Sequence, residues 1–101
     1  MAKLSLKAPQ GLSKAAVSWW GKLLREYQIT DNAGLLLLEQ ALRSFDRAEE
    51  ARLIIDKEGA VIRDRFNQAR THPACQVERD SRAAVVKTLA ALGIDGGPVD
   101  V

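Results

Sequence analysis

The stretch between Asp31 and Gly59 most constrains the fold, because it predicts one uninterrupted helix. Thr30 or Asp31 is suited to cap the start of this helix, and Asp31 also suits the positive end of the helix dipole. Gly59 is suited to end it. Helices average about 11–12 residues, so this one is long for a chain of 101 residues.

The two halves of the long helix differ in their apolar pattern. In the first half, five apolar residues share one side at spacings of three and four positions: Leu38, Ala41, Leu42, Phe45 and Ala48. In the second half the same line continues with Glu49 and Arg52. Two interpretations remain open. The second half is solvated, with Glu49 and Arg52 as a weak pair, or it packs against another subunit, with its charges setting the register. The second interpretation predicts an interface of Phe45, Glu49, Arg52 and Ile55.

Two shorter helices are expected on either side of the long one. Ser13 is a good N-cap for a helix over about 13–27, whose apolar stripe includes Trp19 and Trp20. The final helix runs from Pro73 to about Leu92, with Thr71 or His72 as its cap. Its expected apolar side consists of Val77, Ala84, Val85, Leu89 and Leu92.

The end of the final helix and the segment before it also carry structural signals. Gly93 is suited to a left-handed conformation, and Ile94 is placed to fold back onto Leu89 or Ala90 in a Schellman ending. Residues 60–70 predict two very short strands or an irregular extended loop, with Asp64 in a tight turn. The expected fold class is mainly α: helix, long helix, short extended segment or mini-hairpin, helix.

The length predicts a single domain. Residues 1–12 are expected to be a mobile N-terminal arm, and residues 95–101 a flexible C-terminal tail. The helical domain spans residues 13–94 between them. A mobile end can fold onto a partner, so the tail from Asp95 is a candidate contact for a larger protein.

The sequence offers little for catalysis or for metal binding. His72 is the only histidine and Cys75 the only cysteine, which argues against a zinc site within one chain and against a disulfide framework. The acidic residues are scattered and mostly flanked by basic ones, and no phosphate-binding glycine loop occurs. We therefore expect a protein without catalytic residues, metal or cofactor.

No signal peptide or spanning segment is recognised, which predicts a cytoplasmic protein without a membrane partner.

Basic residues fall in groups, although 15 basic residues against 13 acidic ones leave a net charge of only +2. Dedicated DNA-binding modules usually carry a stronger basic bias. In a ring of many copies, however, the same groups would form a continuous positive belt, and weak contacts would multiply. The candidate DNA-binding residues are Lys3, Lys7, Lys14, Lys22, Arg25, Arg43 and Arg47. Arg63, Arg65 and Arg70 flank the extended segment. Three roles are open for Trp19 and Trp20: they stack on bases, they belong to the core of the first helix, or one of them forms a subunit contact.

The order of these motifs resembles the small subunit of tailed-phage terminases. The resemblance covers roughly residues 9–94. It rests on Pro9-Gln10-Gly11-Leu12-Ser13 with Trp20, on Ile29-Thr30-Asp31 and Glu58-Gly59 around the long helix, and on His72-Pro73 and Leu89-Ala90-Ala91-Leu92-Gly93-Ile94 around the last helix.

The resemblance implies a DNA-packaging function in the host cytoplasm. Small terminase subunits recognise viral DNA and deliver it to a large subunit that carries the ATPase and the nuclease. They form rings, commonly of eight to twelve copies, and modulate the large subunit without catalytic activity of their own. Related systems occur in prophages and gene transfer agents. A separate helix-turn-helix reader is hard to find in this chain, which predicts weak, backbone-directed binding of double-stranded DNA.

Two alternatives follow from the same residues. The first is a purely structural helical adaptor that forms oligomers without a DNA role. The second is a small regulator that binds DNA as a dimer. Mass in solution and a salt-dependent DNA-binding assay separate the three hypotheses.

Overall fold

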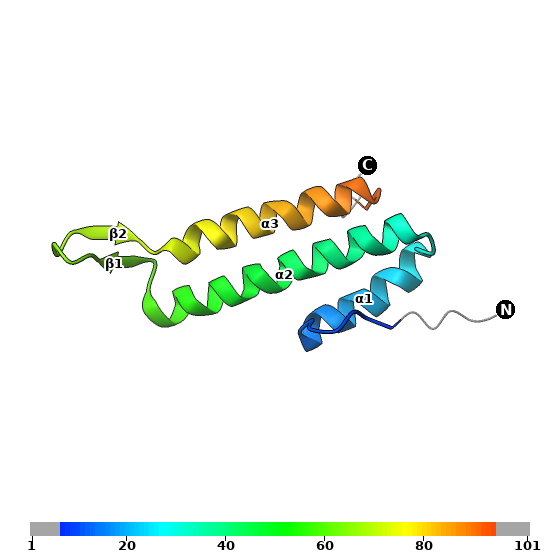
Figure 1. Ribbon diagram of the computed structural model, residues 1–101, viewed down its shortest axis with the longest axis horizontal. Coiled ribbons are helices and arrows are strands. Elements are labelled where there is room, and N and C mark those ends of the chain that lie inside the picture. Colours follow the sequence, from blue (N-terminus) through cyan, green and yellow to red (C-terminus); the bar gives the residue numbers. More distant parts are fainter. Residues whose placement is uncertain (1–6, 95–101) are drawn as a thin grey trace, which may run out of the picture.

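The computed structural model describes residues 7–94 as three helices and one β-hairpin (Figure 1). The helices are α1 (Lys14–Tyr27), α2 (Asn32–Glu58) and α3 (Pro73–Ala91). The strands β1 (Val61–Arg63) and β2 (Ala69–Thr71) pair antiparallel, with Ile62 opposite Arg70. The predicted mainly α order is confirmed, and the extended segment takes the mini-hairpin form of the two that were expected.

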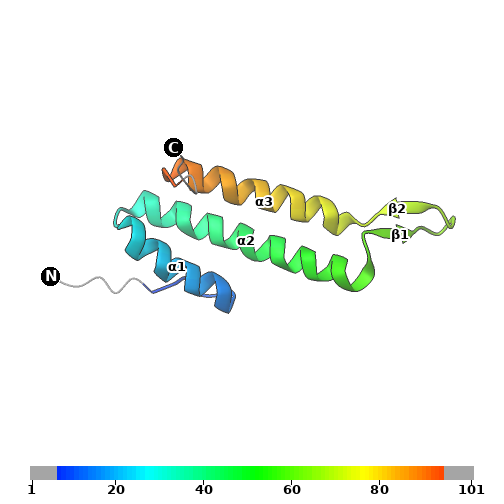
Figure 2. The same ribbon diagram turned by 180° about the vertical axis from the view of Figure 1, so that it is seen from behind.

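Helix α2 is the axis of an elongated molecule that measures 63 × 37 × 19 Å. Helix α3 runs back along α2 over most of its length, whereas α1 lies beside the first half of α2 only (Figures 1 and 2). The β-hairpin projects beyond the shared end of α2 and α3. The second half of α2 therefore packs against α3 without help from α1.

Side chains of the chain itself cap the start of each helix. The Oγ atom of Ser13 accepts the N–H of Ala16 at 3.0 Å, and the Oδ2 atom of Asp31 accepts the N–H of Gly34 at 3.1 Å. The Nδ1 atom of His72 accepts the N–H of Ala74 at 3.0 Å. Each bond satisfies a backbone donor that has no partner within its helix. Ser13 is confirmed as a cap, and the open choices resolve to Asp31 and His72.

Glycines in positive-φ conformations end the two longer helices. Gly59 has φ +90°, and its N–H donates to the carbonyl of Ile55 at 2.7 Å. Gly93 has φ +84°, with its N–H bonded to Ala90 and the N–H of Ile94 bonded to Leu89 at 2.8 Å. This pair of bonds is the Schellman ending predicted from the sequence. It returns Ile94, which is 6 % exposed, to the core.

Two clusters of buried side chains lie along α2. The first joins all three helices around Leu38, which is fully buried, and includes Ala16, Trp20, Ile29, Leu42 and Ile94. The second lies between α2 and α3 near the hairpin and consists of Ala51, Ile55 and Ala74, with Cys75 against it. Ala41 and Ala48 are also buried on α2. Small side chains therefore fill much of the contact between α2 and α3.

Leu89 and Leu92 pack against the first cluster as predicted, but the inward side of α3 differs from the predicted one near the start of the helix. Val77 is 41 % exposed, and Ser81 is buried at 7 % instead. The inward line runs through Ala74, Glu78 and Ser81 to Val85 at alternating spacings of four and three. Counting apolar residues alone placed Val77 on the inward side. The contact with α2 instead takes the smaller side chain of Ser81, four residues later.

The segment before α1 packs against the helices. Ala8 and Leu12 are partly buried against the first cluster. Arg43 donates to the carbonyl of Gln10 at 3.1 Å, and the backbone N–H of Ser13 donates to Asp46 at 2.8 Å. Within the predicted mobile arm of residues 1–12, residues 8–12 therefore contact α2 and the first cluster. Residues 1–6 and the predicted tail, 95–101, lie outside the described residues.

Candidate nucleic-acid and interaction surfaces

One face of α1 carries three of the predicted DNA-binding residues. Lys14, Lys22 and Arg25 are exposed at helical spacing, on the side opposite the buried Ala16 and Trp20. None of the three forms an ion pair with a residue in 7–94. Glu26 is the only acidic residue in α1. We call Lys14, Lys22 and Arg25 the α1 basic face, whose charges are not neutralised by an acidic side chain of residues 7–94.

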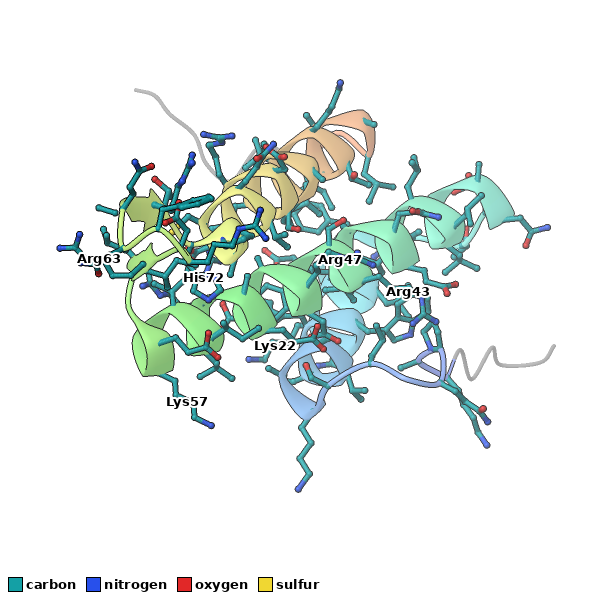
Figure 3. All side chains as sticks on the ribbon, turned by 60° about the vertical axis from the view of Figure 1, so that its left-hand side comes forward. Lys22, Arg43, Arg47, Lys57, Arg63 and His72 are labelled. Atoms are coloured by element: carbon teal, nitrogen blue, oxygen red, sulfur yellow. The ribbon has the colours of Figure 1, made fainter. Side chains whose placement is uncertain are left out.

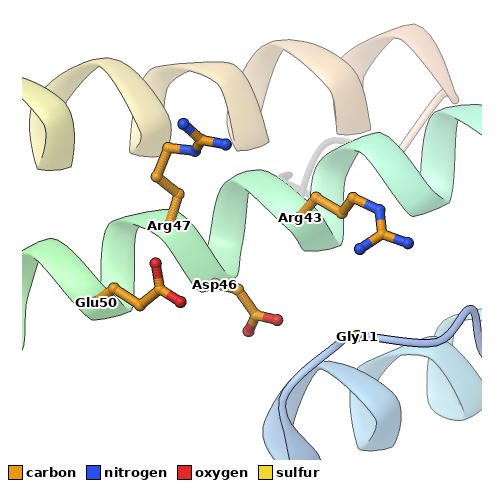
Figure 4. Close-up of a pocket in the computed structure, with 5 residues that line it drawn as sticks. All are labelled: Gly11, Arg43, Asp46, Arg47 and Glu50. Carbon is orange, nitrogen blue, oxygen red and sulfur yellow. The ribbon is translucent and has the colours of Figure 1, made fainter.

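The predicted arginines of α2 do not join this face as one surface. Arg43 forms an ion pair with Glu39 at 2.8 Å and also binds the carbonyl of Gln10. It lines an open polar hollow with Gly11, Asp46, Arg47 and Glu50, in which Arg43 and Asp46 reach toward the Gly11 segment and Arg47 points away from it (Figure 4). Arg43 therefore serves mainly to hold the N-terminal segment. Arg47 is exposed and without an ion pair to a described residue.

Figure 3 shows Lys22, Arg43 and Arg47 on different parts of the helical layer, with Arg63 at the hairpin. Lys7 is exposed at the start of the described chain, and Lys3 lies before it. Of the seven predicted DNA-binding residues, the structure thus gathers Lys14, Lys22 and Arg25. The other candidates are dispersed or engaged elsewhere.

The charged residues of the predicted subunit interface form contacts inside the chain. Arg82 of α3 lies 3.3 Å from Glu49 of α2 and 2.9 Å from Glu78. Arg52 lies 3.5 Å from Glu78 and 3.1 Å from Asp56. The hydrogen bond to Glu78, followed by that to Glu49, raises the pKa of Arg82 against the opposing effect of desolvation. Glu49 and Arg52 therefore link α2 to α3, which neither interpretation of this half-helix anticipated.

The two apolar residues of that predicted interface have different places. Ile55 is 5 % exposed and packs in the second cluster with Ala51 and Ala74, so its side chain is already covered within the chain. Phe45 is half-buried and lines an open apolar groove. Of the four predicted interface residues, Phe45 is therefore the one whose side chain borders an open apolar surface.

We define the apolar groove by residues from all three helices: Trp19, Leu23, Ala41, Leu42, Phe45, Val85 and Leu89. Trp19 is 45 % exposed, whereas the neighbouring Trp20 is 6 % exposed and belongs to the first cluster. The core interpretation of the tryptophan pair thus holds for Trp20 and fails for Trp19. The Nζ atom of Lys22 lies 4.9 Å from the Trp19 ring centroid, so the α1 basic face borders the groove.

The turn of the hairpin is built around one carboxylate. Asp64 accepts the N–H groups of Phe66 at 2.8 Å and Gln68 at 3.0 Å, as well as the Nε–H of Arg70 at 2.9 Å. The hydrogen bond from Gln68, followed by that from Arg70, lowers the pKa of Asp64. Asn67 takes φ +63°, a conformation that asparagine tolerates. The predicted tight turn at Asp64 is confirmed.

The lone histidine and cysteine have structural surroundings. His72 caps α3 through Nδ1, which accepts the N–H of Ala74, and its Nε2 atom lies 2.8 Å from Glu58. Cys75 is half-buried, with its sulfur 3.8 Å from the carbonyl of Ala60. Within residues 7–94, no three His, Cys, Asp or Glu side chains gather as metal ligands, and no helix has the length and apolar character to cross a membrane.

Comparisons of this chain with protein families, with curated proteins and with solved structures found no match. The α1 basic face, the apolar groove and the order of the sequence motifs are therefore the features that indicate a function.

Proposed function

We propose that this chain is the small, non-catalytic subunit of a viral or virus-like DNA-packaging terminase. In this role it binds double-stranded DNA weakly through the phosphate backbone, presents it to a large ATPase and nuclease subunit, and regulates that subunit in the host cytoplasm. The observation that best supports the proposal is the combination on α1 of three unpaired cations with the half-exposed Trp19 at an apolar groove. One helix thus offers a surface for DNA and a border for self-association.

The number of cations explains why the proposal includes a ring. Three phosphate contacts give a salt dependence of log K with a slope of about −2.7, which corresponds to weak binding. Several copies on one DNA molecule convert later contacts into intramolecular ones and multiply the affinity. We therefore propose a closed ring of eight to twelve copies in which neighbouring chains meet at the apolar groove.

The apolar groove also supports a second candidate function. A helical adaptor that associates through the groove, without binding DNA, requires the same apolar residues and leaves the α1 basic face solvated. The two functions differ in what the cations of α1 do, and that difference is measurable.

The test measures duplex binding by fluorescence anisotropy across a salt series, and native mass spectrometry gives the mass of the assemblies in the same samples. Lys14→Glu/Lys22→Glu should weaken binding at least tenfold at low salt. The control, Arg79→Glu/Lys87→Glu, changes net charge equally on exposed positions of α3 and should have a smaller effect. Assembled wild-type protein that binds no DNA at low salt would support the adaptor, and a stable dimer at micromolar concentration would exclude the ring.

A further inference from the structure

The β-hairpin carries as much net charge as the whole chain. Residues 60–71 contain Arg63, Arg65 and Arg70 against the single acid Asp64, while the complete sequence has a net charge of +2. The rest of the chain is therefore balanced between acids and bases. Arg70 neutralises Asp64 at 2.9 Å, but Arg63 and Arg65 form no ion pair with any residue the structure describes. Two uncompensated guanidinium groups remain on one short turn.

An exposed aromatic side chain lies beside one of these charges. Phe66 is 68 % exposed, and the guanidinium carbon of Arg65 lies 5.1 Å from its ring centroid. The hairpin projects past the ends of both long helices (Figure 1), so Phe66 is not placed to complete either buried cluster. Most of this large apolar ring stays in water after folding. Burying it against a partner would therefore be favourable, because it removes apolar surface from water.

The turn holds Phe66 and its neighbouring cations in a defined arrangement. The Asp64 carboxylate accepts three hydrogen bonds, including the N–H of Phe66 itself, and the Nη1 atom of Arg63 donates to the carbonyl of Asn67 at 2.9 Å. A turn that is ordered before binding loses little conformational entropy when it binds. The ordered turn therefore holds the exposed Phe66 ring in a position from which it can contact a partner.

The charges indicate which partner fits this tip. An apolar protein pocket that received Phe66 would also have to desolvate Arg63 and Arg65, which costs free energy without matching anions. Duplex DNA supplies phosphates for both arginines beside sugars and base edges for an apolar ring. Phenylalanine is one of the apolar side chains that proteins insert between base steps from the minor groove.

We propose that the hairpin tip is a second DNA-contacting element, separate from the α1 basic face. Arg63 and Arg65 bind phosphates on either side of a minor groove, and Phe66 acts as a wedge that partly unstacks one base step and bends the duplex. This inference rests on the proposed function in taking double-stranded DNA as the partner. It assigns a different element of the chain to a different part of the contact.

The experiment measures affinity and DNA bending together, using the full chain and a duplex labelled for anisotropy and for end-to-end energy transfer. Phe66→Ala should reduce affinity about fivefold or more, remove the bend and leave the salt slope unchanged. Arg63→Gln/Arg65→Gln should reduce the steepness of the slope by about two. Val61→Ala, a change at an exposed apolar side chain of β1, is the matched control and should behave as wild type.

The outcomes separate this inference from the proposed function. Loss of binding in the α1 variants, with wild-type affinity and bending in both tip variants, would overturn the wedge and leave the packaging role standing. An effect of Phe66→Ala on single-stranded DNA alone would overturn its duplex form. Wild-type protein that binds neither kind of DNA at low salt would remove both proposals. Amide spectra of residues 64–68 should be retained in every tip variant outside the substituted position.

Discussion

At the scale of single residues, Gly34 shows how closely the start of α2 is packed. A Cβ atom at this position would lie 2.8 Å from both the Cγ2 atom of Ile29 and the Oδ1 atom of Asp31. Alanine normally favours a helix over glycine by up to about 1 kcal/mol. Here Gly34→Ala should instead destabilise the fold by about 1–3 kcal/mol, because it displaces the cap Asp31 and the buried Ile29.

Gly21 provides the matched control for this substitution. It also lies within a helix, but a Cβ there would meet only the terminal Nη1 atom of Arg25 at 3.3 Å. Because that flexible side chain can move, Gly21→Ala should be neutral or stabilising by up to about 1 kcal/mol. Urea unfolding of the two variants should give midpoints on opposite sides of wild type, and two equal shifts would show that the clash at Gly34 is relieved.

A second prediction at this scale concerns the pH dependence of the hairpin. Hydrogen bonds from Gln68 and then Arg70 lower the pKa of Asp64 from its ordinary 3.8. A lowered folded pKa means that the ionised carboxylate stabilises the turn fully above the ordinary value. That contribution is then lost as the pH falls through the lower, folded value.

The measurement is an NMR titration of the Asp64 carboxyl together with hydrogen exchange at Phe66 and Gln68. The carboxyl should titrate below 3.8, and protection of the two amides should disappear over the same pH range. Asp64→Asn removes the charge that binds Arg70 but keeps an acceptor oxygen, so its turn should show no such dependence. An ordinary titration of Asp64 would contradict the hydrogen-bond geometry.

At the scale of elements, small side chains set the distance between α2 and α3. Ala51 is 3 % exposed and packs with Ile55 and Ala74 where the two helices meet. Ala51→Leu adds carbon atoms at a buried position where α2 meets α3, and the larger side chain should cost about 1–3 kcal/mol. Ala83→Leu, on an exposed part of α3, should stay within about 0.5 kcal/mol. Thermal unfolding checks both, and equal stability of the two variants would mean that the helices separate easily.

The elements that the sequence predicted well depend on local chemistry. Ser13, Gly59 and the Gly93-Ile94 pair act on backbone groups within a few residues, so their roles follow from neighbouring positions alone. The pairing of α2 with α3 was not predictable in this way. Glu49 and Arg82 are 33 residues apart, and the contact between them exists only because the hairpin reverses the chain. The burial of Ser81 and the exposure of Val77 depend on the same long-range packing.

The candidate sites show the same difference between local sequence signals and contacts of residues far apart in the chain. Lys14, Lys22 and Arg25 lie together because helical spacing places them on one face, which the sequence alone determines. Arg43 had the same apparent role, yet its contact with Gln10, 33 residues earlier, gives it a structural one. The apolar groove needs side chains from three helices, so no single segment could have revealed it. Its one visible signal in the sequence was the pair Trp19-Trp20, because two adjacent helical side chains cannot both face the same core.

At the scale of the whole molecule, the apolar groove leads to a prediction about self-association of the chain. Half-exposed tryptophans at the centre of an interface commonly contribute about 2 kcal/mol or more to association, which is roughly a thirtyfold change in dissociation constant. Trp19→Lys places a flexible charge in the groove and should therefore shift assemblies toward single chains. Leu36→Lys introduces the same charge at a position that is 57 % exposed and outside the groove. It should leave the assembly intact.

Sedimentation velocity over a concentration series distinguishes the two variants, with circular dichroism to show that both retain their helices. Because Trp19 is half-exposed in the single chain, its replacement removes little from the core, and a loss of mass would report on contacts between chains. If Leu36→Lys dissociates the assembly and Trp19→Lys does not, the interface lies elsewhere on α2. If wild type stays a single chain at all concentrations, the proposed ring is excluded, and the multiplied contacts on which its DNA binding depends are lost.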